Sequence, residues 1–161
     1  MLKRKEIPLR VTHNDTKLNN VLFDIQTDRP LAVIDLDTIM PGSLCYDFGD
    51  AIRFGCNSAN EDEKNLKKVY FRLDLYIVFL NGFLMALGKT ITKKEKENLA
   101  LGSIMMTIEC GMRFLTDYLE GDHYFHTKYS NHNLIRCRTQ LKLVEGMEQH
   151  LEEMNALILN Y

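Results

Sequence analysis

Hydrophobic residues in the carboxy-terminal two thirds of the chain recur every three or four positions, which is the spacing of an amphipathic helix. This spacing predicts a helix over Leu73–Leu87 that ends at Gly88. Thr92 and Glu95 form the pattern of a capping box, so a second helix is expected to begin there and to continue to about Leu119. The chain beyond residue 55 is therefore expected to be helical.

The second helix carries one apolar face that is expected to lie in the core, methionines included: Leu101, Ile104, Met105, Ile108, Met112, Leu115 and Leu119. Asn131 or Asn133 is expected to cap a final long helix. The apolar residues of that helix follow a period of about 3.5, which indicates a core face or a dimer seam: Leu134, Leu141, Val144, Met147, Leu151, Met154 and Ile158.

The amino-terminal quarter shows short apolar runs separated by polar turns. Residues 9–12, 21–23 and 31–34 predict three short strands, and the last two are expected to form a β hairpin. Pro41 and Gly42 indicate a turn, and a short helix is expected from Tyr46 to Arg53. The polar residues 57–68 predict a mobile surface loop. The expected fold class is α+β, mainly α-helical.

Four polar side chains flank the predicted hairpin. His13, Asp15 and Asn20 follow the order HxDxxxxN before its first strand, and Asp35 follows its second strand. Enzymes that transfer phosphoryl groups keep a base near the attacking oxygen and apart from the oxygen ligands of Mg²⁺. Since Mg²⁺ is usually held by one or two carboxylates plus water and substrate phosphates, this set indicates nucleotide-dependent phosphoryl transfer.

The motif HNDTKLNN followed by VIDLDT resembles the aminoglycoside phosphotransferase and choline kinase family. It differs from protein kinases because Asn14 stands where they carry Arg, and Asp-Leu-Asp at residues 35–37 replaces Asp-Phe-Gly. The runs IDLDTIMPGSLCYDFGDAIRFG and GMRFLTDYLEGDHYF most resemble the N-acetylhexosamine 1-kinase group, which phosphorylates an amino sugar at its anomeric hydroxyl. The resemblance implies a protein-kinase-like carboxy-terminal lobe whose short hairpin carries the catalytic and metal-binding loops, with ATP and Mg²⁺ as cofactors.

The resemblance also implies roles for single residues. Asp15 would be the base or orienting group, and Asn20 and Asp35 would bind Mg²⁺ and thereby the nucleotide. Asp37, two positions on, would face the same side of a continuing strand and add a metal contact or bind outer-shell water. Lys17 would neutralise the transferred phosphate, or it is a surface lysine.

Two further residues near the motif are expected to be structural. His13 is interpreted as a packing residue that hydrogen-bonds the loop backbone. Asp47 matches a family aspartate that braces the catalytic loop through backbone hydrogen bonds, and a helix N-cap is the compatible plain interpretation.

A second group of polar residues lies near a helix end and Gly121. By resemblance, Arg113, Asp117 and Tyr124 contribute to the acceptor pocket, and the alternative is an Arg–Asp salt bridge beside a packed tyrosine. Three histidines nearby lack a metal-binding pattern and are expected to be solvated: His123, His126 and His132.

Chain length limits what the resemblance implies. Only fourteen residues precede Asp15, and the first glycine is Gly42, so the Gly-rich loop and phosphate-binding lysine of a nucleotide lobe are not found. Residues 1–161 are therefore expected to be one domain, the carboxy-terminal lobe, with a catalytic and metal-binding segment (1–55) and a helical subdomain (56–161). The isolated chain is expected to be inactive because the amino-terminal nucleotide lobe is absent.

Composition narrows the function classes further. The net charge of −2, from 22 acidic and 20 basic residues, gives no electrostatic footprint for nucleic acid. Four widely separated cysteines without a CxxC pattern favour free thiols and a cytoplasmic location. No apolar run is expected to reach the ~18 residues of a membrane span.

Three alternatives stay open. A truncated, non-catalytic fragment would bind a sugar or a partner, and would dimerise through the face left by the missing lobe. A kinase for another acceptor would act on an aminoglycoside, choline or homoserine, although few acidic residues cluster late in the chain to attract a cation. A more distant alternative is a haloacid dehalogenase-like phosphatase, because an apolar strand ends in Asp-Leu-Asp-Thr; that fold requires repeated alternation of strands and helices downstream.

Overall fold

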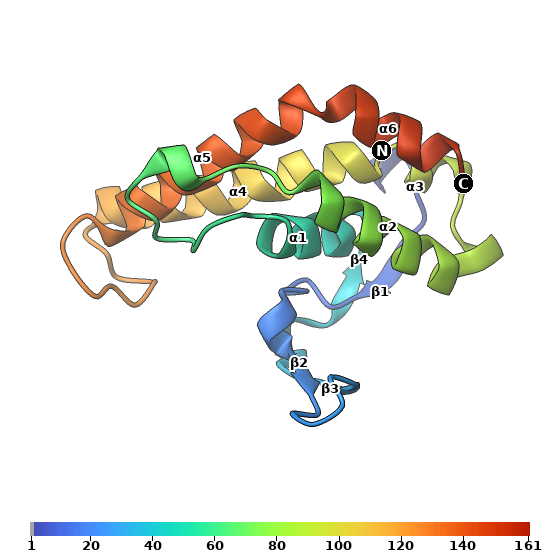
Figure 1. Ribbon diagram of the computed structural model, residues 1–161, viewed down its shortest axis with the longest axis horizontal. Coiled ribbons are helices and arrows are strands. Elements are labelled where there is room, and N and C mark those ends of the chain that lie inside the picture. Colours follow the sequence, from blue (N-terminus) through green and yellow to red (C-terminus); the bar gives the residue numbers. More distant parts are fainter. Residues whose placement is uncertain (1) are drawn as a thin grey trace.

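The computed structural model describes residues 2–161, apart from the side chain of residue 3. A body of helices carries a protruding β hairpin (Figure 1). The helices are α1 (Leu44–Gly55), α2 (Leu73–Leu87), α3 (Lys93–Lys96), α4 (Leu99–Glu120), α5 (His132–Gln149) and α6 (Leu151–Leu159). Short 3₁₀ turns span Leu2–Arg4, Leu18–Asn20, Leu36–Thr38, Leu66–Lys68 and Gly88–Thr90. The mainly helical α+β class is confirmed.

Four short strands form two separate antiparallel pairs. Strand β1 (Arg10–Thr12) pairs with β4 (Met40–Gly42), so the turn predicted at Pro41 and Gly42 is wrong. Strands β2 (Val21–Phe23) and β3 (Pro30–Val33) form the expected hairpin, with Val21 opposite Val33. All strand pairs within residues 2–161 are antiparallel, which does not fit the alternating strands and helices that the phosphatase alternative requires.

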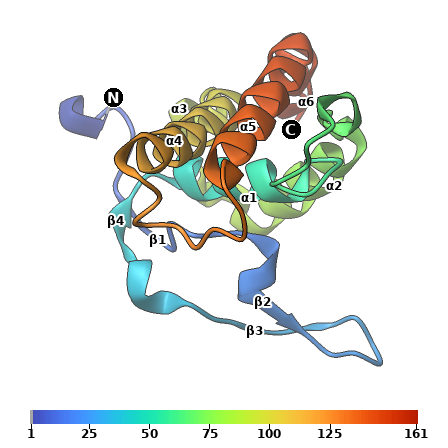
Figure 2. The same ribbon diagram turned by 90° about the vertical axis from the view of Figure 1, so that its left-hand side faces the viewer.

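Helix α4 is the centre of the helical body and packs between α1 and α5 (Figure 2). Gly49 of α1 and Gly102 of α4 allow the two backbones to approach, because a Cβ atom at Gly49 would collide with the carbonyl group of Gly102. The buried face of α4 therefore carries small or polar residues along with larger ones: Ala100, Gly102, Ser103, Ile104, Thr107, Gly111 and Phe114.

This packing overturns the expected core face of α4. The residues of the predicted stripe that lie exposed are Leu101, Met105, Met112, Leu115 and Leu119, whereas Ile104 is buried. The close approach of α1 and α5 selects the face with small side chains, which a hydrophobic period does not reveal.

The capping box at Thr92 and Glu95 is confirmed, but the helix it begins is only α3. The Glu95 carboxylate also accepts hydrogen bonds from Arg10 at 2.9 and 2.8 Å. The fully buried Glu95 thus ties strand β1 to the turn before α4. Because α4 begins anew at Leu99, the single helix predicted to reach about Leu119 is divided in two.

The predicted final helix is also divided, into α5 and α6, at His150. Asn131 precedes α5 with a left-handed backbone (φ 64°) and makes no side-chain capping bond. Val144, Met147, Met154 and Ile158 are buried as expected, so most of the predicted stripe faces the core.

Two helical stretches are long and apolar enough to cross a membrane by length and composition alone, so the expectation that none exists is wrong: Leu73–Thr90 and Leu99–Glu120. The second stretch is the central helix α4, whose packing against α1 and α5 accounts for its apolar character. Core helices of this kind meet the same criterion, so the finding carries no further conclusion.

Candidate active site

The loop between β1 and β2 (residues 13–20), named the catalytic loop after the role that the resemblance implies for it, is held in place by helix α1. The Asp47 carboxylate accepts hydrogen bonds from the backbone N–H groups of His13 at 2.9 Å and Asn14 at 2.8 Å. This is the bracing contact that the resemblance implies. Asp47 does not cap the helix, because Ser43 is the N-cap and accepts a bond from the Cys45 N–H.

His13 links the catalytic loop to the hairpin. Its Nε2 lies 3.0 Å from the Ile34 carbonyl oxygen, and the Ile34 N–H donates to the Asn20 carbonyl at 2.9 Å. Both polar atoms of the Ile34 backbone are therefore engaged by the catalytic loop. Asp35, the next residue, is thereby placed at the same end of the hairpin as Asn20, and the structural interpretation of His13 fits these contacts.

Asp15, Lys17 and Asn20 form one connected group. The Lys17 ammonium lies 2.8 Å from the Asp15 carboxylate, and the Asn20 amide donates to that carboxylate at 2.9 Å and to the Asp15 carbonyl at 2.8 Å. Partial burial alone would raise the pKa of Asp15, but the hydrogen bonds from Lys17 and Asn20 outweigh burial and lower the pKa. Asp15 is therefore an ionised, oriented acceptor at neutral pH.

Asp35 adopts a left-handed backbone (φ 63°), and a 3₁₀ turn over Leu36–Thr38 follows it. Asn14 shares this unusual backbone, also with φ 63°. Such conformations cost energy and cluster at functional sites. Strand β3 already ends at Val33 and the backbone turns at Asp35, so the prediction that Asp37 faces the same side of a continuing strand as Asp35 is wrong; Asp37 is exposed.

The donor set at this end of the hairpin suits Mg²⁺. The NH₂ group of Asn20 is committed to Asp15, and its amide oxygen accepts no hydrogen bond from the residues that the structure describes. The Asp35 carboxylate likewise accepts no hydrogen bond and forms no ion pair with the residues that the structure describes. No group of three or more His, Cys, Asp or Glu side chains within residues 2–161 has the arrangement of a metal site. One amide and one carboxylate agree with the Mg²⁺ sites in which nucleotide and water complete the coordination.

A cavity of about 490 Å³ opens in front of Asp15. Its walls come from the catalytic loop, the end of α1, the loop after α1, helices α4 and α5, and the loop that joins them. Its charged lining residues are Asp15, Lys17, Arg53, Glu61, Arg113 and Arg136. Cationic side chains thus outnumber carboxylates around the space that an acceptor would occupy.

The three predicted acceptor residues divide between two roles. Arg113 and Tyr124 line the cavity, and the Arg113 guanidinium donates to the Tyr124 hydroxyl at 3.3 Å. Asp117 is buried and accepts hydrogen bonds from the Tyr124 N–H at 2.7 Å and the Phe125 N–H at 2.9 Å. The Arg113–Asp117 salt bridge, which was the alternative interpretation, does not form. The Nε atom of Arg113 instead lies 3.8 Å from Oε1 of Glu109.

Asp117 acts on the site through the loop that it holds. Burial alone would raise the pKa of Asp117, but hydrogen bonds from the backbone N–H groups of Phe125, Tyr124 and His123 outweigh burial and lower it. The Asn133 amide adds a further bond at 2.8 Å. The ionised carboxylate therefore fixes the loop that carries Tyr124.

Comparison with known proteins bears directly on this site. Residues 2–72 match the model of the phosphotransferase enzyme family. The match contains the catalytic loop, the hairpin, α1 and the loop after it. It supports the resemblance to the aminoglycoside phosphotransferases and a kinase-type phosphotransferase activity. ATP and Mg²⁺ are general cofactors of such enzymes.

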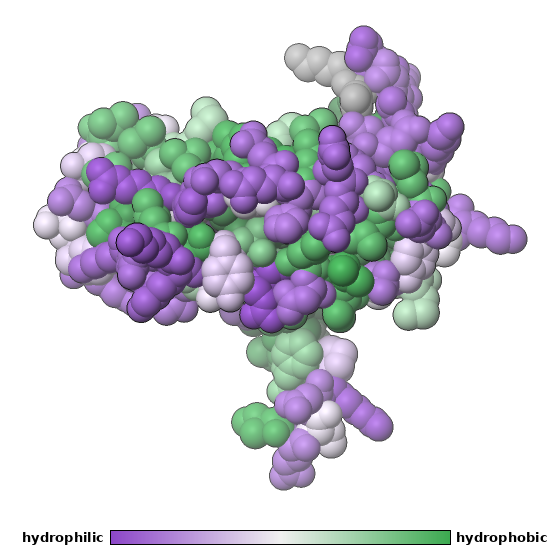
Figure 3. Space-filling model, turned by 45° about the horizontal axis from the view of Figure 1, so that its top comes forward, coloured by the Kyte–Doolittle hydropathy of each residue, from purple (hydrophilic) through white to green (hydrophobic). Residues whose placement is uncertain are grey.

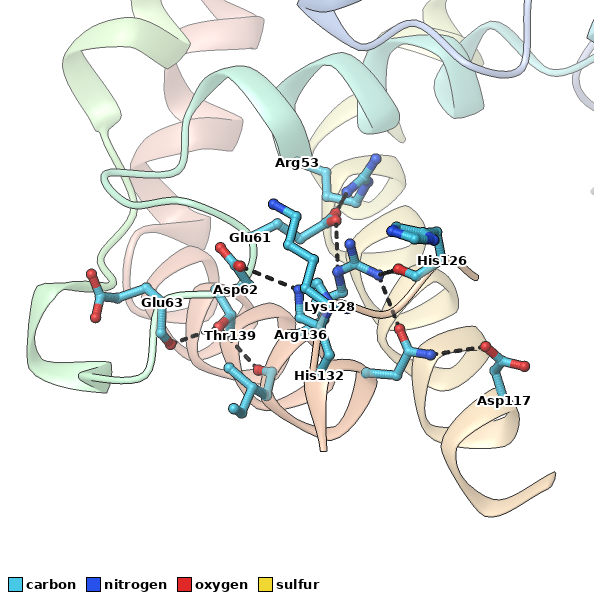
Figure 4. A network of polar contacts seen from close by, with 12 residues as sticks. Arg53, Glu61, Asp62, Glu63, Asp117, His126, Lys128, His132, Arg136 and Thr139 are labelled. Atoms are coloured by element: carbon cyan, nitrogen blue, oxygen red, sulfur yellow. Dashed lines mark hydrogen bonds and ion pairs between the residues drawn. The ribbon is translucent and has the colours of Figure 1, made fainter. Parts of the chain in front are cut away.

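Sequence reasoning missed a charged network that borders the cavity of this phosphotransferase-like site (Figure 4). The buried Arg53 donates to Asp50 at 2.9 Å and to Glu61 at 3.0 Å. Arg136 lies 3.8 Å from Glu61 and donates to the His126 carbonyl at 3.3 Å. The sequence signal for Arg53 was its position three residues after Asp50, within the run that resembles the N-acetylhexosamine 1-kinases. Glu61 and Arg136 gave no local sequence signal.

The loop at residues 57–68 belongs to this network rather than to open surface. Glu61 pairs with Arg53, and the Asp62 carboxylate lies 3.2 Å from Nε2 of His132. His132 is fully buried, so the prediction of three solvated histidines is wrong for this one. Burial, with the charge of Arg136, lowers the pKa of His132 and keeps the ring neutral at pH 7.

All four cysteines are free, as expected. Cys110 lines the cavity, and burial raises the pKa of its thiol to about 11. A thiol with so high a pKa is poorly nucleophilic at neutral pH.

Proposed function

We propose that this chain carries the catalytic groups of a small-molecule kinase that transfers the γ-phosphoryl group of ATP to a hydroxyl. The observation that carries the proposal is the Asp15–Lys17–Asn20 group, in which Asp15 and Lys17 line a cavity large enough for a sugar. The phosphotransferase family match over residues 2–72 supports the same reaction class.

In this mechanism Asp15 orients the acceptor hydroxyl and takes its proton as the new bond to phosphorus forms. Because the pKa of Asp15 is lowered, the carboxylate accepts the proton late, when the hydroxyl oxygen has become more acidic. Lys17 would offset negative charge on the transferred group. Asn20 and Asp35 would hold Mg²⁺, which neutralises the phosphate oxygens when bound.

The proposed acceptor is an N-acetylhexosamine, phosphorylated at its anomeric hydroxyl. Four cationic and two acidic side chains line the cavity, which disfavours a polycationic aminoglycoside or choline. A neutral sugar avoids this repulsion, and Tyr124, Phe125 and Phe54 provide aromatic surface for its ring.

Asp37 remains a candidate outer-shell ligand on the hairpin side. A cytoplasmic location is part of the same proposal.

Asp15→Asn tests the catalytic assignment. In the longest natural polypeptide that contains these residues, we expect turnover to fall by roughly 10³-fold or more, because the amide cannot take the proton. The assay is transfer of labelled γ-phosphate to N-acetylglucosamine, and thermal unfolding of the variant checks that the fold is intact. Turnover equal to that of the unchanged protein would refute the assignment.

A further inference from the structure

Two loops that wall the acceptor cavity are joined to each other by the first turns of α5. The loop after α1 (residues 56–65) contributes Glu61 to the cavity wall, and the loop between α4 and α5 (residues 121–131) contributes Tyr124. Figure 4 shows the side chains of α5 that reach between the two loops. The separation of the loops across the cavity is therefore set in part from α5.

His132 makes one of these connections. Its Nδ1 accepts a hydrogen bond from the backbone N–H of Lys128 at 3.1 Å, and its Nε2 lies 3.2 Å from the Asp62 carboxylate. Because a backbone N–H can only donate, Nδ1 must carry a lone pair, and the ring proton must sit on Nε2. The ring is therefore neutral, and its Nε2–H donates to Asp62.

Arg136, one helical turn later on α5, makes a second connection between the same loops. Its Nε lies 3.8 Å from Glu61, the neighbour of Asp62, and its guanidinium donates to the His126 carbonyl at 3.3 Å. Arg136 keeps its charge at any pH at which a protein is folded, whereas the imidazole of His132 can gain a proton. The two connections therefore differ in their response to pH.

Burial and nearby cations disfavour a second proton on His132. The ring is fully buried, and the charges of Arg136 on α5 and Lys128 on the neighbouring loop add to the effect of burial, which lowers the pKa of His132. The Asp62 carboxylate acts in the opposite direction. Because the folded chain then binds the proton less readily than the unfolded chain, falling pH favours opening of this contact.

The other side chains around His132 hold the same loops. Tyr129 lies against the imidazole with ring centroids 4.5 Å apart, and the Lys64 ammonium, from the loop after α1, lies 4.4 Å from the Tyr129 centroid. On the α4 side, the Asp117 carboxylate accepts a hydrogen bond from the amide of Asn133, the residue after His132. Asp117 is thereby committed to its own contacts, and Lys64 brings a further positive charge to the loops around the ring.

We propose that His132 is a positioning residue that couples the two loops, and that a proton gained at Nδ1 releases the loop carrying Tyr124. A protonated Nδ1 is a donor that faces the N–H of Lys128, so their hydrogen bond is lost. The Asp62 contact persists, because Nε2 still donates. For the acceptor proposed above, release of the loop weakens binding, so the inference rests on that proposed function and adds control by pH to it.

Two substitutions separate the two halves of this contact. His132→Asn places an amide oxygen near the position of Nδ1, so it keeps an acceptor for the Lys128 N–H without a titrating group. His132→Gln reaches the position of Nε2 and keeps the Asp62 contact, but it leaves the Lys128 N–H without its acceptor. A residue that only filled space would give two variants with the same binding.

Isothermal titration calorimetry of the full chain with N-acetylglucosamine measures the effect on the cavity. From about pH 7.5 to about one unit below the pKa that NMR gives for the His132 ring, the unchanged chain is expected to lose affinity about fivefold, the equivalent of one net hydrogen bond. His132→Asn should bind equally well at both pH values, and His132→Gln should bind about fivefold more weakly at both. His150→Gln, a partly exposed histidine between α5 and α6, is the matched control and should keep the pH dependence.

Hydrogen exchange of the Lys128 backbone amide tests the coupling without any sugar. Its protection factor is expected to fall below the pKa of His132 by up to about tenfold per pH unit, as uptake of one proton requires. His132→Asn should keep the protection at low pH.

A Lys128 protection factor that does not fall in the unchanged chain, or that falls equally in His132→Asn, would overturn the inference. So would an affinity for the sugar that responds to pH in the same way in His132→Asn and in the unchanged chain. If no sugar binds at any pH while the amide exchange behaves as expected, the proposed function fails and the coupling of the loops by His132 is supported.

Discussion

The β2–β3 hairpin with its catalytic loop differs sharply from the Arg53–Glu61–Arg136 network across the cavity. The hairpin projects from the helical body (Figure 3), and all four residues of its strand β3 are exposed. The network is built around a buried arginine and joins α1, the loop after it and α5. The first region holds proposed catalytic groups on one continuous stretch, whereas the second assembles a pocket wall from three separate segments.

The two regions are held in place by different interactions. The groups near Asp15 are fixed by a few hydrogen bonds to α1, notably those to Asp47. The network is fixed by burial, because an arginine removed from water requires its carboxylate partners. Changes in the network should therefore act mainly on folding, and changes in the catalytic loop mainly on turnover.

The largest effect on folding is expected for Arg53→Met. Removing the guanidinium leaves the buried Asp50 without its partner, and breaking a buried pair in this way costs about 3–5 kcal/mol. Urea unfolding measures the loss, and Arg138→Met, an exposed position on α5, is the control that should change little. A loss below about 1 kcal/mol, the range of surface pairs, would show that the network does not stabilise the fold.

A smaller effect on folding, with a marked effect on turnover, is expected for Asp47→Ala. Two backbone N–H groups lose a charged acceptor, which costs about 1.5–3 kcal/mol. Asp47→Asn keeps one oxygen acceptor, so its free energy of unfolding and its turnover should fall between those of Asp47→Ala and those of the unchanged chain. If hydrogen exchange at His13 and Asn14 is as slow in Asp47→Ala as in the unchanged chain, the carboxylate does not brace the loop.

The same contrast explains what the sequence allowed us to predict. The bounds of α2 followed from local signals, the apolar spacing and Gly88, and the hairpin followed from strand and turn patterns over residues 21–34. The Asp15–Asn20 contact also lies within one short motif. Local spacing therefore predicts what local contacts determine.

The features that sequence reasoning missed depend on contacts between distant segments. Glu61 sits in a charged stretch that resembles a solvated loop, and only the fold brings it to Arg136, far along the chain. The buried face of α4 was missed for a related reason, because close helix packing at Gly102 favours small residues over the methionine stripe. His132 gave no sign of burial, since its partner Asp62 is seventy residues away.

A smaller effect, confined to pH dependence, is expected for Lys17→Met. Lys17 helps to lower the pKa of Asp15, so removing Lys17 should raise that pKa. A catalytic carboxylate must be ionised, and the acidic limb of the profile of kcat/KM against pH should therefore move to higher pH. Lys67→Met, an exposed lysine away from the site, is the control. An unmoved acidic limb would mean that Lys17 does not set the ionisation of Asp15.

The smallest effect is expected for association through the hairpin. Leu31 and Val33 are 65% and 54% exposed on β3, and such apolar surface favours contact with a second copy of the chain. If the predicted homodimer uses this face, Leu31→Lys should shift sedimentation toward the monomer without changing the melting temperature. Leu159→Lys, a similarly exposed position on α6, should leave the association unchanged. A chain that sediments as a monomer at its highest soluble concentration would contradict the dimer, and the exposed apolar face of the hairpin would then not associate with a second copy.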